Sequence, residues 1–292
     1  MMIDFNFESF VRYAQEHFPA LCQARASDSH KGTFGSIGVL GGAQGMVGAP
    51  ILAARAALKL GTGRVYIGFA QETVPIAIDP LHAEIMLKSA HELLKLSHLT
   101  SLVIGCGLGL DEYAKNLFIL SLNQLTDIPM VIDADALSLL AQEPTLLQAP
   151  QAAIRVLTPH PSEAARLLGW STEQIQADRH AALDALLTRY QQWIILKGHQ
   201  TLIGSPDGQI YTNPSGNPGL ASGGTGDVLA GMIGALLAQA VPVEQAIVGA
   251  TWLHGAAADY LVSQGVGPIG LSASEVLIAA RTLRNLLVSS AE

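Results

Sequence analysis

The chain has 292 residues, of which 49% are hydrophobic and 14% charged, so it can bury a sizeable core and is not expected to be disordered. Its net charge of −8 argues against nucleic-acid binding, which needs a clustered excess of Lys and Arg. The two cysteines, Cys22 and Cys106, are too few for a disulfide scaffold and lack the spacing of a zinc site. Apolar segments are broken well before the ~18 residues that a membrane span requires.

The N-terminal segment MMIDFNFESFVRYAQEHF carries acidic residues and no continuous apolar stretch, which excludes a signal peptide. Together with the scarcity of cysteine, this predicts a soluble protein in the reduced cytoplasm. Residues 1–27 are expected to form a helical arm ahead of a sheet.

Short apolar runs alternate with longer helical patterns over the next part of the chain. The runs are almost continuously apolar, as expected for parallel strands that are covered on both faces. This rhythm predicts a doubly wound α/β fold. The predicted strands are 37–40, 64–68, 102–105, 130–133, 153–157 and 193–197, and the clearest helices between them are 49–61, 162–169 and 181–192.

The pattern changes after residue 197. Residues 201–214 predict a hairpin, with Pro206, Asp207 and Gly208 at its turn. From Thr225 onward the chain is expected to be largely helical. Because no linker, charge block or internal repeat divides the chain, residues 28–290 are expected to form one domain.

A glycine-rich loop precedes the first of these late helices, in the stretch GLASGGTGDVLAGM (219–232). The apolar spacing after it predicts that the helix begins at Thr225, which aims free N–H groups and the positive end of its dipole at the glycines. Such a terminus binds phosphate or a developing anion, with Gly224 and Gly226 exposing the backbone. Asp227 then has two interpretations: an ordinary partner of the helix dipole, or a general base beside an anion hole.

Two other phosphate motifs are excluded. The loop lacks the GK[ST] of a P-loop. A literal GxGxxG at Gly265, Gly267 and Gly270 contains Pro268 and follows a helical pattern rather than a strand, so it is not a dinucleotide fingerprint.

The stretch NPGLASGGTGDVLAG (217–231) resembles the signature of the ribokinase-like superfamily, and the chain is most similar to its ADP- or ATP-dependent NAD(P)H-hydrate dehydratases. The resemblance covers about residues 28–287 and implies a three-layer α/β/α fold with a central, mostly parallel sheet. The supporting motifs, in order, are HKGTFGSIGVLGGAQGMVGAP (30–50), GCGLG (105–109), VIDADAL (131–137), TPHPSE (158–163) and LKGHQT (196–201).

The resemblance also implies roles for individual residues. Asp227 is the expected catalytic residue, with Gly224 and Gly226 as the anion hole. The hydrated dinucleotide is expected to contact Ala49, Gly107, His160 and Asp227. The chain departs from the family at Cys106, where Pro is usual, and at Ser162, where Gly is usual. The expected nucleotide-binding residues are Lys197, Gly198, His199, Gln200, Thr201 and Gly226.

Several acidic and basic positions have more than one interpretation. Glu163 is expected to help to position Mg²⁺, while Ser162 or Glu163 caps a helix. Asp133 and Asp135 either act on Mg²⁺ through water or cap the next helix. Lys197 either ends its strand in solvent or faces phosphate. His254 is interpreted as a structural residue.

The implied function is dehydration of S-form NADH or NADPH hydrate, with Mg²⁺ as cofactor, ADP as the expected phosphoryl donor and ATP as the alternative donor. A separate NAD(P)H-hydrate epimerase is a possible partner, and a homo-oligomer, specifically a homotetramer, is expected. Two alternatives stay open. The first is a kinase for a vitamin precursor or sugar, which would release a phosphorylated product, and the second is a nucleotide sensor without turnover.

Overall fold

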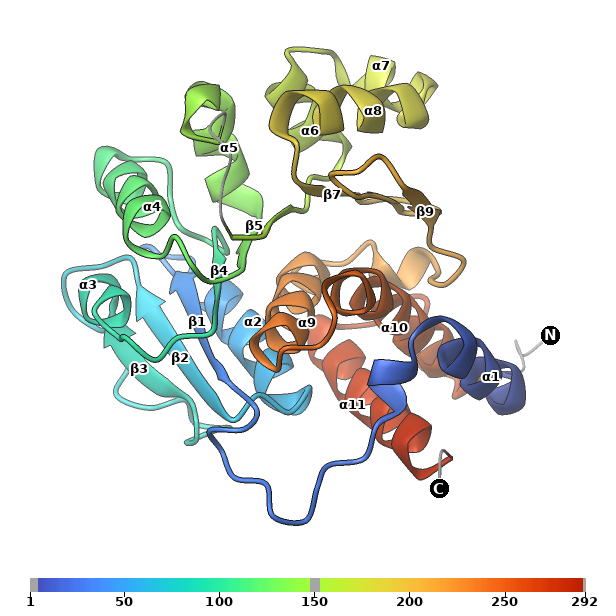
Figure 1. Cartoon of the computed structure of the whole chain (residues 1–292). Coiled ribbons are helices and arrows are strands. Elements are labelled where there is room, and N and C mark those ends of the chain that lie inside the picture. The colour runs from blue at the N-terminus through green and yellow to red at the C-terminus, as the bar shows by residue number, and fades with distance from the viewer. Residues whose placement is uncertain (1–4, 148–152, 291–292) are drawn as a thin grey trace.

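The computed structural model describes residues 5–147 and 153–290, which form a nine-stranded sheet in the order β3-β2-β1-β4-β5-β6-β7-β8-β9 (Figure 1). Strands β1 to β7 pair in parallel, and β8 and β9 extend the sheet as an antiparallel hairpin. The strands are β1 Ser36–Gly41, β2 Arg64–Phe69, β3 Met86–Ser89, β4 Ser101–Ile104, β5 Met130–Ile132, β6 Arg155–Leu157, β7 Trp193–Leu196, β8 Leu202–Gly204 and β9 Ile210–Thr212.

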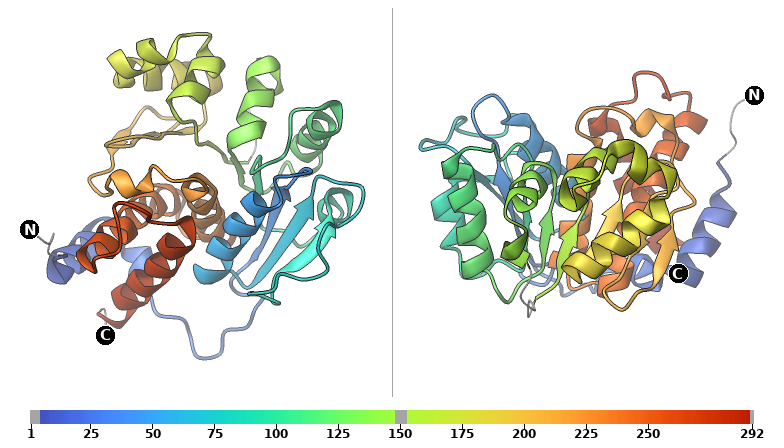
Figure 2. Two further views of the ribbon diagram at one scale, coloured as in Figure 1. Left: turned by 180° about the vertical axis from the view of Figure 1, so that it is seen from behind. Right: turned by 90° about the horizontal axis from the view of Figure 1, so that it is seen from above.

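Helices cover both faces of this sheet, which confirms the doubly wound α/β prediction (Figure 2). On one face, α2 (Gly48–Lys59) and α9 (Thr225–Ala238) lie on the strands, and α10 (Val243–Ser263) and α11 (Ala273–Ser289) pack behind them. The other face carries α3 Ala90–Leu94, α4 Glu112–Gln124, α5 Ala134–Gln142, α6 Pro161–Leu168, α7 Thr172–Ala177 and α8 Arg179–Tyr190. Short 3₁₀ helices are formed by Pro19–Cys22 (η1), Pro144–Leu147 (η2) and Pro218–Leu220 (η3).

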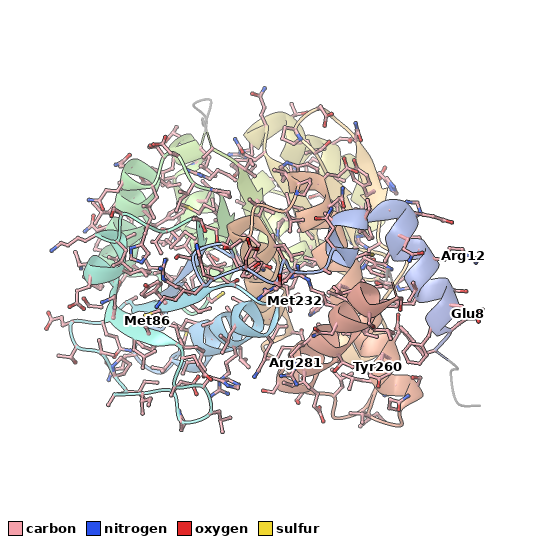
Figure 3. All side chains as sticks on the ribbon, turned by 60° about the horizontal axis from the view of Figure 1, so that its bottom comes forward. Glu8, Arg12, Met86, Met232, Tyr260 and Arg281 are labelled. Carbon is pink, nitrogen blue, oxygen red and sulfur yellow. The ribbon has the colours of Figure 1, made fainter. Side chains whose placement is uncertain are left out.

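The central strands are mostly apolar because successive side chains enter different cores. Ile37 and Val39 of β1 pack with α2 and α9, whereas Leu40 joins the core of the opposite face. Met232, at the centre of α9, is fully buried (Figure 3). Helix α9 is therefore apolar on almost every side, as a helix enclosed between a sheet and two further helices must be.

The N-terminal helix α1 (Phe7–His17) packs against α10 and α11. The ring of Phe10 stacks on Trp252 of α10 with 4.8 Å between the centroids, and Ala14 is fully buried in the same core. The expected helical arm thus shares the core of the domain, although residues 1–4 lie outside the described residues. None of the helices in the described part of the chain combines the length and apolar character needed to cross a membrane.

The predicted helices and strands match the structure within a few residues, except at two strands. The strand expected at 153–157 begins only at Arg155, and β3 at the edge of the sheet was not predicted. Strand β3 contains Lys88 and Ser89 and none of its residues is fully buried, so it lacks the apolar run that identifies the other strands.

Candidate active site

The direction of the strand order reverses between β1 and β4, and in doubly wound sheets such a switch point marks the crevice outside the carboxyl ends of the strands. The chain proceeds outward in opposite directions from these two strands, and ligands bind in such a crevice. The loops that follow them are joined, because the N–H of Ala43 donates to the carbonyl of Gly107 at 2.7 Å. Gly107 has φ +61°, and a Cβ placed there would lie 3.3 Å from that of Ala49. Two predicted substrate-binding residues thus form one corner of the crevice, called here the Ala49–Gly107 corner.

Helix α9 begins at Thr225, as predicted, with Gly224 as its N-cap. Gly224 has φ +88°, a conformation that costs any other residue free energy. The Thr225 hydroxyl donates to the carbonyls of Leu220 (2.8 Å) and Ser222 (2.9 Å), which holds the loop in place. No side chain in the described residues caps this end, so its N–H groups remain open to an anion.

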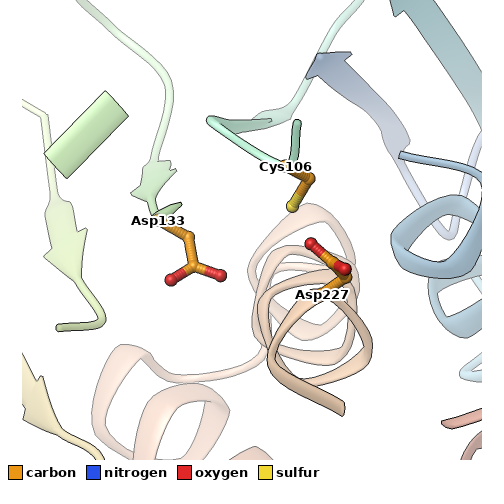
Figure 4. Close-up of side chains that lie close together, drawn as sticks. All are labelled: Cys106, Asp133 and Asp227. Carbon is orange, nitrogen blue, oxygen red and sulfur yellow. The ribbon is translucent and has the colours of Figure 1, made fainter. Parts of the chain in front are cut away.

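Asp227 lies in the first turn of α9 and faces two residues that follow strands (Figure 4). Its carboxylate, the Cys106 thiol and the Asp133 carboxylate each place one atom within 4.8 Å of the others. Burial, and next the negative charge of Asp133, raise the pKa of Asp227 to about 6, although Cys106 and Lys197 act against this rise. A carboxylate with that pKa is largely ionised at neutral pH and is a better proton acceptor than an ordinary aspartate.

Lys197, at the end of β7, forms an ion-pair network with two carboxylates. Its Nζ lies 2.8 Å from Oδ1 of Asp133 and 3.8 Å from Oε2 of Glu163. Burial opposes the charge, but the two carboxylates outweigh it and raise the pKa of Lys197. A Cβ on Gly226 would lie 3.5 Å from the same Nζ. The ammonium group therefore faces the anion loop, and the solvent-facing interpretation of this residue is wrong.

The two aspartates after β5 do not act as side-chain caps of α5. Asp133 is the N-cap residue, but its Oδ1 accepts from Thr158 at 2.7 Å and from Lys197 instead. Asp135 accepts from the N–H of Gly109 at 2.9 Å, which ties the loop after β4 to α5. The capping interpretation of Asp133 is therefore wrong, because a buried ammonium group competes for that carboxylate.

His160 is the N-cap of α6, and of the two predicted capping residues Glu163 caps the helix as the second member of a capping box, whereas Ser162 does not. Its Nδ1 accepts from the N–H groups of Ser162 (3.2 Å) and Glu163 (3.4 Å). Glu163 completes a capping box by accepting from the His160 N–H at 2.8 Å, and its Oε1 lies 3.2 Å from His160 Nε2. Burial, followed by the charges of Lys197 and Arg166, lowers the pKa of His160 to about 4. The histidine is thus neutral, with its ring orientation fixed by the helix that it caps.

A cavity of about 560 Å³ adjoins the anion loop. Its lining includes all six predicted nucleotide-binding residues, Lys197 to Thr201 and Gly226, together with a second wall that was not predicted. This second wall runs from Asn213 to Ala221. His254 of α10 also lines the cavity, and its buried Nε2 has no hydrogen-bond partner among the described residues. The run NPSGNPG was an available signal, since Asn, Pro and Gly mark a loop just before the anion site.

Residues 37–277 match the family model described as NAD(P)H-hydrate dehydratase. The chain is 48% identical to the ADP-dependent (S)-NAD(P)H-hydrate dehydratase of Neisseria meningitidis over 274 residues, which cover 94% of this chain and 93% of that protein. It is also 42% identical to the bifunctional NAD(P)H-hydrate repair enzyme of Coxiella burnetii, covering 92% of this chain and only 54% of that protein.

A solved structure has the same architecture. The ADP/ATP-dependent NAD(P)H-hydrate dehydratase of Bacillus subtilis, co-crystallised with ATP and Mg²⁺, superposes with a TM-score of 0.81 at 29% identity. The match covers 94% of this chain and 98% of that one, and bears out the predicted ribokinase-like α/β/α fold. The chain therefore belongs to the NAD(P)H-hydrate dehydratase family.

Proposed function

We propose that this protein converts the S form of hydrated NADH or NADPH back to the reduced dinucleotide, with ADP as the phosphoryl donor. One observation carries the proposal: Asp227 lies where the two halves of the site meet. The preceding residue, Gly226, lines the 560 Å³ cavity, while Asp227 itself approaches Cys106, the neighbour of Gly107. The relative from Neisseria meningitidis, named as ADP-dependent and S-specific, supports the choice of substrates.

In this proposal the nucleotide occupies the cavity and the hydrated nicotinamide ring lies at the Ala49–Gly107 corner. Residues from Lys197 to Thr201 contact the nucleotide, with its terminal phosphate against the N–H groups of Gly224 to Gly226. His160 contacts the dinucleotide from the neighbouring helix α6. These binding roles remain predictions, and the arrangement of the residues in the crevice supports them.

The first chemical step is phosphoryl transfer. The ring hydroxyl attacks the terminal phosphorus of ADP, a new O–P bond forms, and AMP leaves with the electrons of the broken P–O bond. Asp227 accepts the proton of the hydroxyl. The open N–H groups of α9 and the ammonium of Lys197 stabilise the charge on the transferring group.

The second step is elimination. The lone pair of the ring nitrogen expels inorganic phosphate by breaking the C–O bond, and loss of a ring proton restores the dihydronicotinamide. Phosphate is a much better leaving group than hydroxide, which is the reason for consuming a nucleotide. The net products are NAD(P)H, AMP and phosphate.

The donor set suits Mg²⁺ at Asp133. Mg²⁺ binds proteins through one or two carboxylates together with substrate phosphates. Oδ1 of Asp133 is engaged by Lys197 and Thr158, while Oδ2 faces Gly226, 3.9 Å from where its Cβ would lie. Glu163 was expected to help with Mg²⁺, but its oxygens are shared by His160 and Lys197. When bound, the ion would neutralise charge on the phosphates.

Recovery of dihydronicotinamide absorbance tests the proposal. Purified protein receives hydrated NADH, Mg²⁺ and either ADP or ATP, alongside Asp227→Asn and the control Asp184→Asn, which changes an exposed aspartate of α8. We expect the wild type to restore the absorbance with ADP. Asp227→Asn should abolish this recovery, and the control variant should largely retain it. A folded, ADP-binding protein that restores no absorbance with either nucleotide would refute the proposal.

The comparisons support the dehydratase over the alternative of a small-molecule kinase, although Asp227 and the anion loop would also serve a kinase. The two activities differ in their product, since a kinase leaves a stable phosphate ester where a dehydratase releases inorganic phosphate. Release of one phosphate for each NADH restored favours the dehydratase. A homotetramer also remains proposed, and light scattering of the purified protein tests it.

A further inference from the structure

The second wall of the nucleotide cavity is held by one face of α10. Asn213 Nδ2 donates to the carbonyl of Thr251 at 3.3 Å, and the Ser215 hydroxyl donates to that of Trp252 at 2.8 Å. A turn later, a Cβ on Gly255 would lie 2.2 Å from the Ser215 hydroxyl, so α10 can approach the wall only because this residue is glycine.

Asp259, four residues beyond Gly255 on the same face, makes the remaining contacts. Its Oδ2 accepts from the N–H of Gly216 at 2.8 Å, and its Oδ1 accepts from Asn217 Nδ2 at 2.9 Å. Both donors belong to residues that line the cavity, whereas Asp259 does not line it. Hydrogen bonds to a charged acceptor are stronger than neutral ones, so this carboxylate is the firmest of the links.

The effect of Asp259 extends to the anion loop through Asn217. Oδ1 of Asn217 accepts from the N–H of Gly219 at 3.0 Å, which caps the 3₁₀ helix η3. The last residue of that helix, Leu220, accepts from the Thr225 hydroxyl at 2.8 Å. A continuous chain of hydrogen bonds and covalent links therefore joins Asp259 to the first residue of α9.

We infer that Asp259 is a positioning residue for the nucleotide: it fixes the second wall of the cavity and, through Asn217, the loop that would bind the terminal phosphate. The inference deepens the proposed function and rests on it for the identity of the ligand. A carboxylate is required because two donors converge on one side chain. An asparagine at this position has one acceptor, and its amide group would oppose one of the two donors.

An exchange of the two side chains provides the sharpest test. Asp259→Asn alone places an amide against the amide of Asn217, and Asn217→Asp alone places two carboxylates together. In the double variant, the Oδ1 of residue 259 can accept from Gly216 while its amide donates to the carboxylate at 217. That carboxylate still accepts from Gly219, so every hydrogen bond has a partner again and the net charge is unchanged.

The readout is the affinity for ADP, measured by calorimetry on the full chain with Mg²⁺ and compared with the KM for hydrated NADH. We expect each single variant to raise the Kd for ADP about tenfold, or about 1.4 kcal/mol, with little change in the KM for the hydrate. The double variant should recover most of that loss. Thermal unfolding verifies that each variant is folded.

Tyr260→Leu is the matched control, because the side chain that follows Asp259 points from a different face of α10. Its ring packs against Phe5 and Phe7, with centroids 5.5 and 5.9 Å apart, beside α1 (Figure 3). This variant loosens α10 without touching the wall and should bind ADP as the wild type does. Equal weakening by Tyr260→Leu, or unchanged ADP affinity in Asp259→Asn, would overturn the inference.

The two proposals can fail separately. If the wild type restores NADH and Asp259→Asn binds ADP normally, only the positioning role is lost. If the wild type binds ADP without restoring NADH, and Asp259→Asn weakens that binding, the positioning role stands and the dehydratase fails.

Discussion

Alanine substitution of three glycines at the start of α9 separates backbone strain from loss of the anion site. Gly224 has φ +88°, and its added Cβ would lie 2.5 Å from Leu52 Cδ1. Gly223 is exposed, and among the described residues its Cβ would meet nothing within 4 Å. A Cβ on Gly226 would lie at ordinary contact distance from Lys197 Nζ, 3.5 Å away. The same added methyl group therefore has three different expected results.

Gly224→Ala should lower the free energy of unfolding by about 1–3 kcal/mol. The left-handed conformation costs about 1–2 kcal/mol for a residue with a Cβ, and the contact with Leu52 adds part of the cost of overpacking. The end of a leucine side chain can move, which keeps that second contribution small. Gly223→Ala, the control, should stay within about 0.5 kcal/mol of the wild type, because it meets neither penalty.

Gly226→Ala should leave stability unchanged or raise it by up to about 1 kcal/mol, because alanine is favoured over glycine inside a helix. Its methyl group would occupy space beside Lys197 where we place the phosphate, so ADP-dependent turnover should fall about tenfold or more. Urea unfolding and the NADH absorbance assay measure the two effects. A Gly224→Ala variant as stable as the wild type, or a fully active Gly226→Ala variant, would refute this reasoning.

Activity should fall below about pH 6, because only ionised Asp227 accepts the proton of the hydroxyl; an acidic limb near pH 4 in a pH–rate profile would contradict this. Arg55→Met should cost about 1–3 kcal/mol at pH 7, because it removes the cation that contacts the buried carboxylate of Asp79 at 2.7 Å, while the N–H groups of Leu81 and His82 still donate to it. Burial raises the pKa of Asp79, but Arg55 and two backbone N–H groups outweigh this and lower it in the folded protein. The ion pair therefore stabilises the fold above the pKa that Asp79 has in the unfolded chain, and this stabilisation is lost as the pH falls. Urea midpoints for wild type and variant should therefore converge in acid, and a constant difference would argue against the pair. Thiol reagents should label Cys22 and Cys106 only on unfolding, because both are buried with raised pKa values; rapid labelling of native protein would disprove it.

The layered fold could be predicted because each central strand is apolar on both faces, and local spacing records this directly. The start of α9 at Thr225 could also be predicted from a short stretch of sequence, because a glycine-rich loop is followed there by apolar residues at helical spacing. Strand β3 escaped prediction because it lies at the edge of the sheet, where one side of the strand has no neighbour and polar residues are tolerated.

Most of the electrostatic arrangement could not be predicted in this way. Lys197 contacts Asp133 and Glu163 only because β5, β6 and β7 lie side by side, and spacing along the chain does not reveal this. The same applies to Asp259, which looks like an ordinary residue on an apolar helix until Gly216 and Asn217 fold against it. His160 was recognised as important, but its capping role depends on a ring orientation that no motif specifies.

The hairpin of β8 and β9 has a consequence for the order in which the site forms. Its two strands pair with the register Leu202 to Thr212, and just beyond them the N–H of Asn213 donates to the carbonyl of Thr201 at 2.9 Å. Two walls of the cavity are therefore brought together by a contact between near neighbours in the chain, of the kind that forms in about microseconds. Asp133 and Asp227, by contrast, meet only after several parallel strands have assembled, which is intrinsically slower. During refolding, the contact that joins these two walls can thus form before the carboxylates meet, but the second wall is fixed only when α10 packs against it.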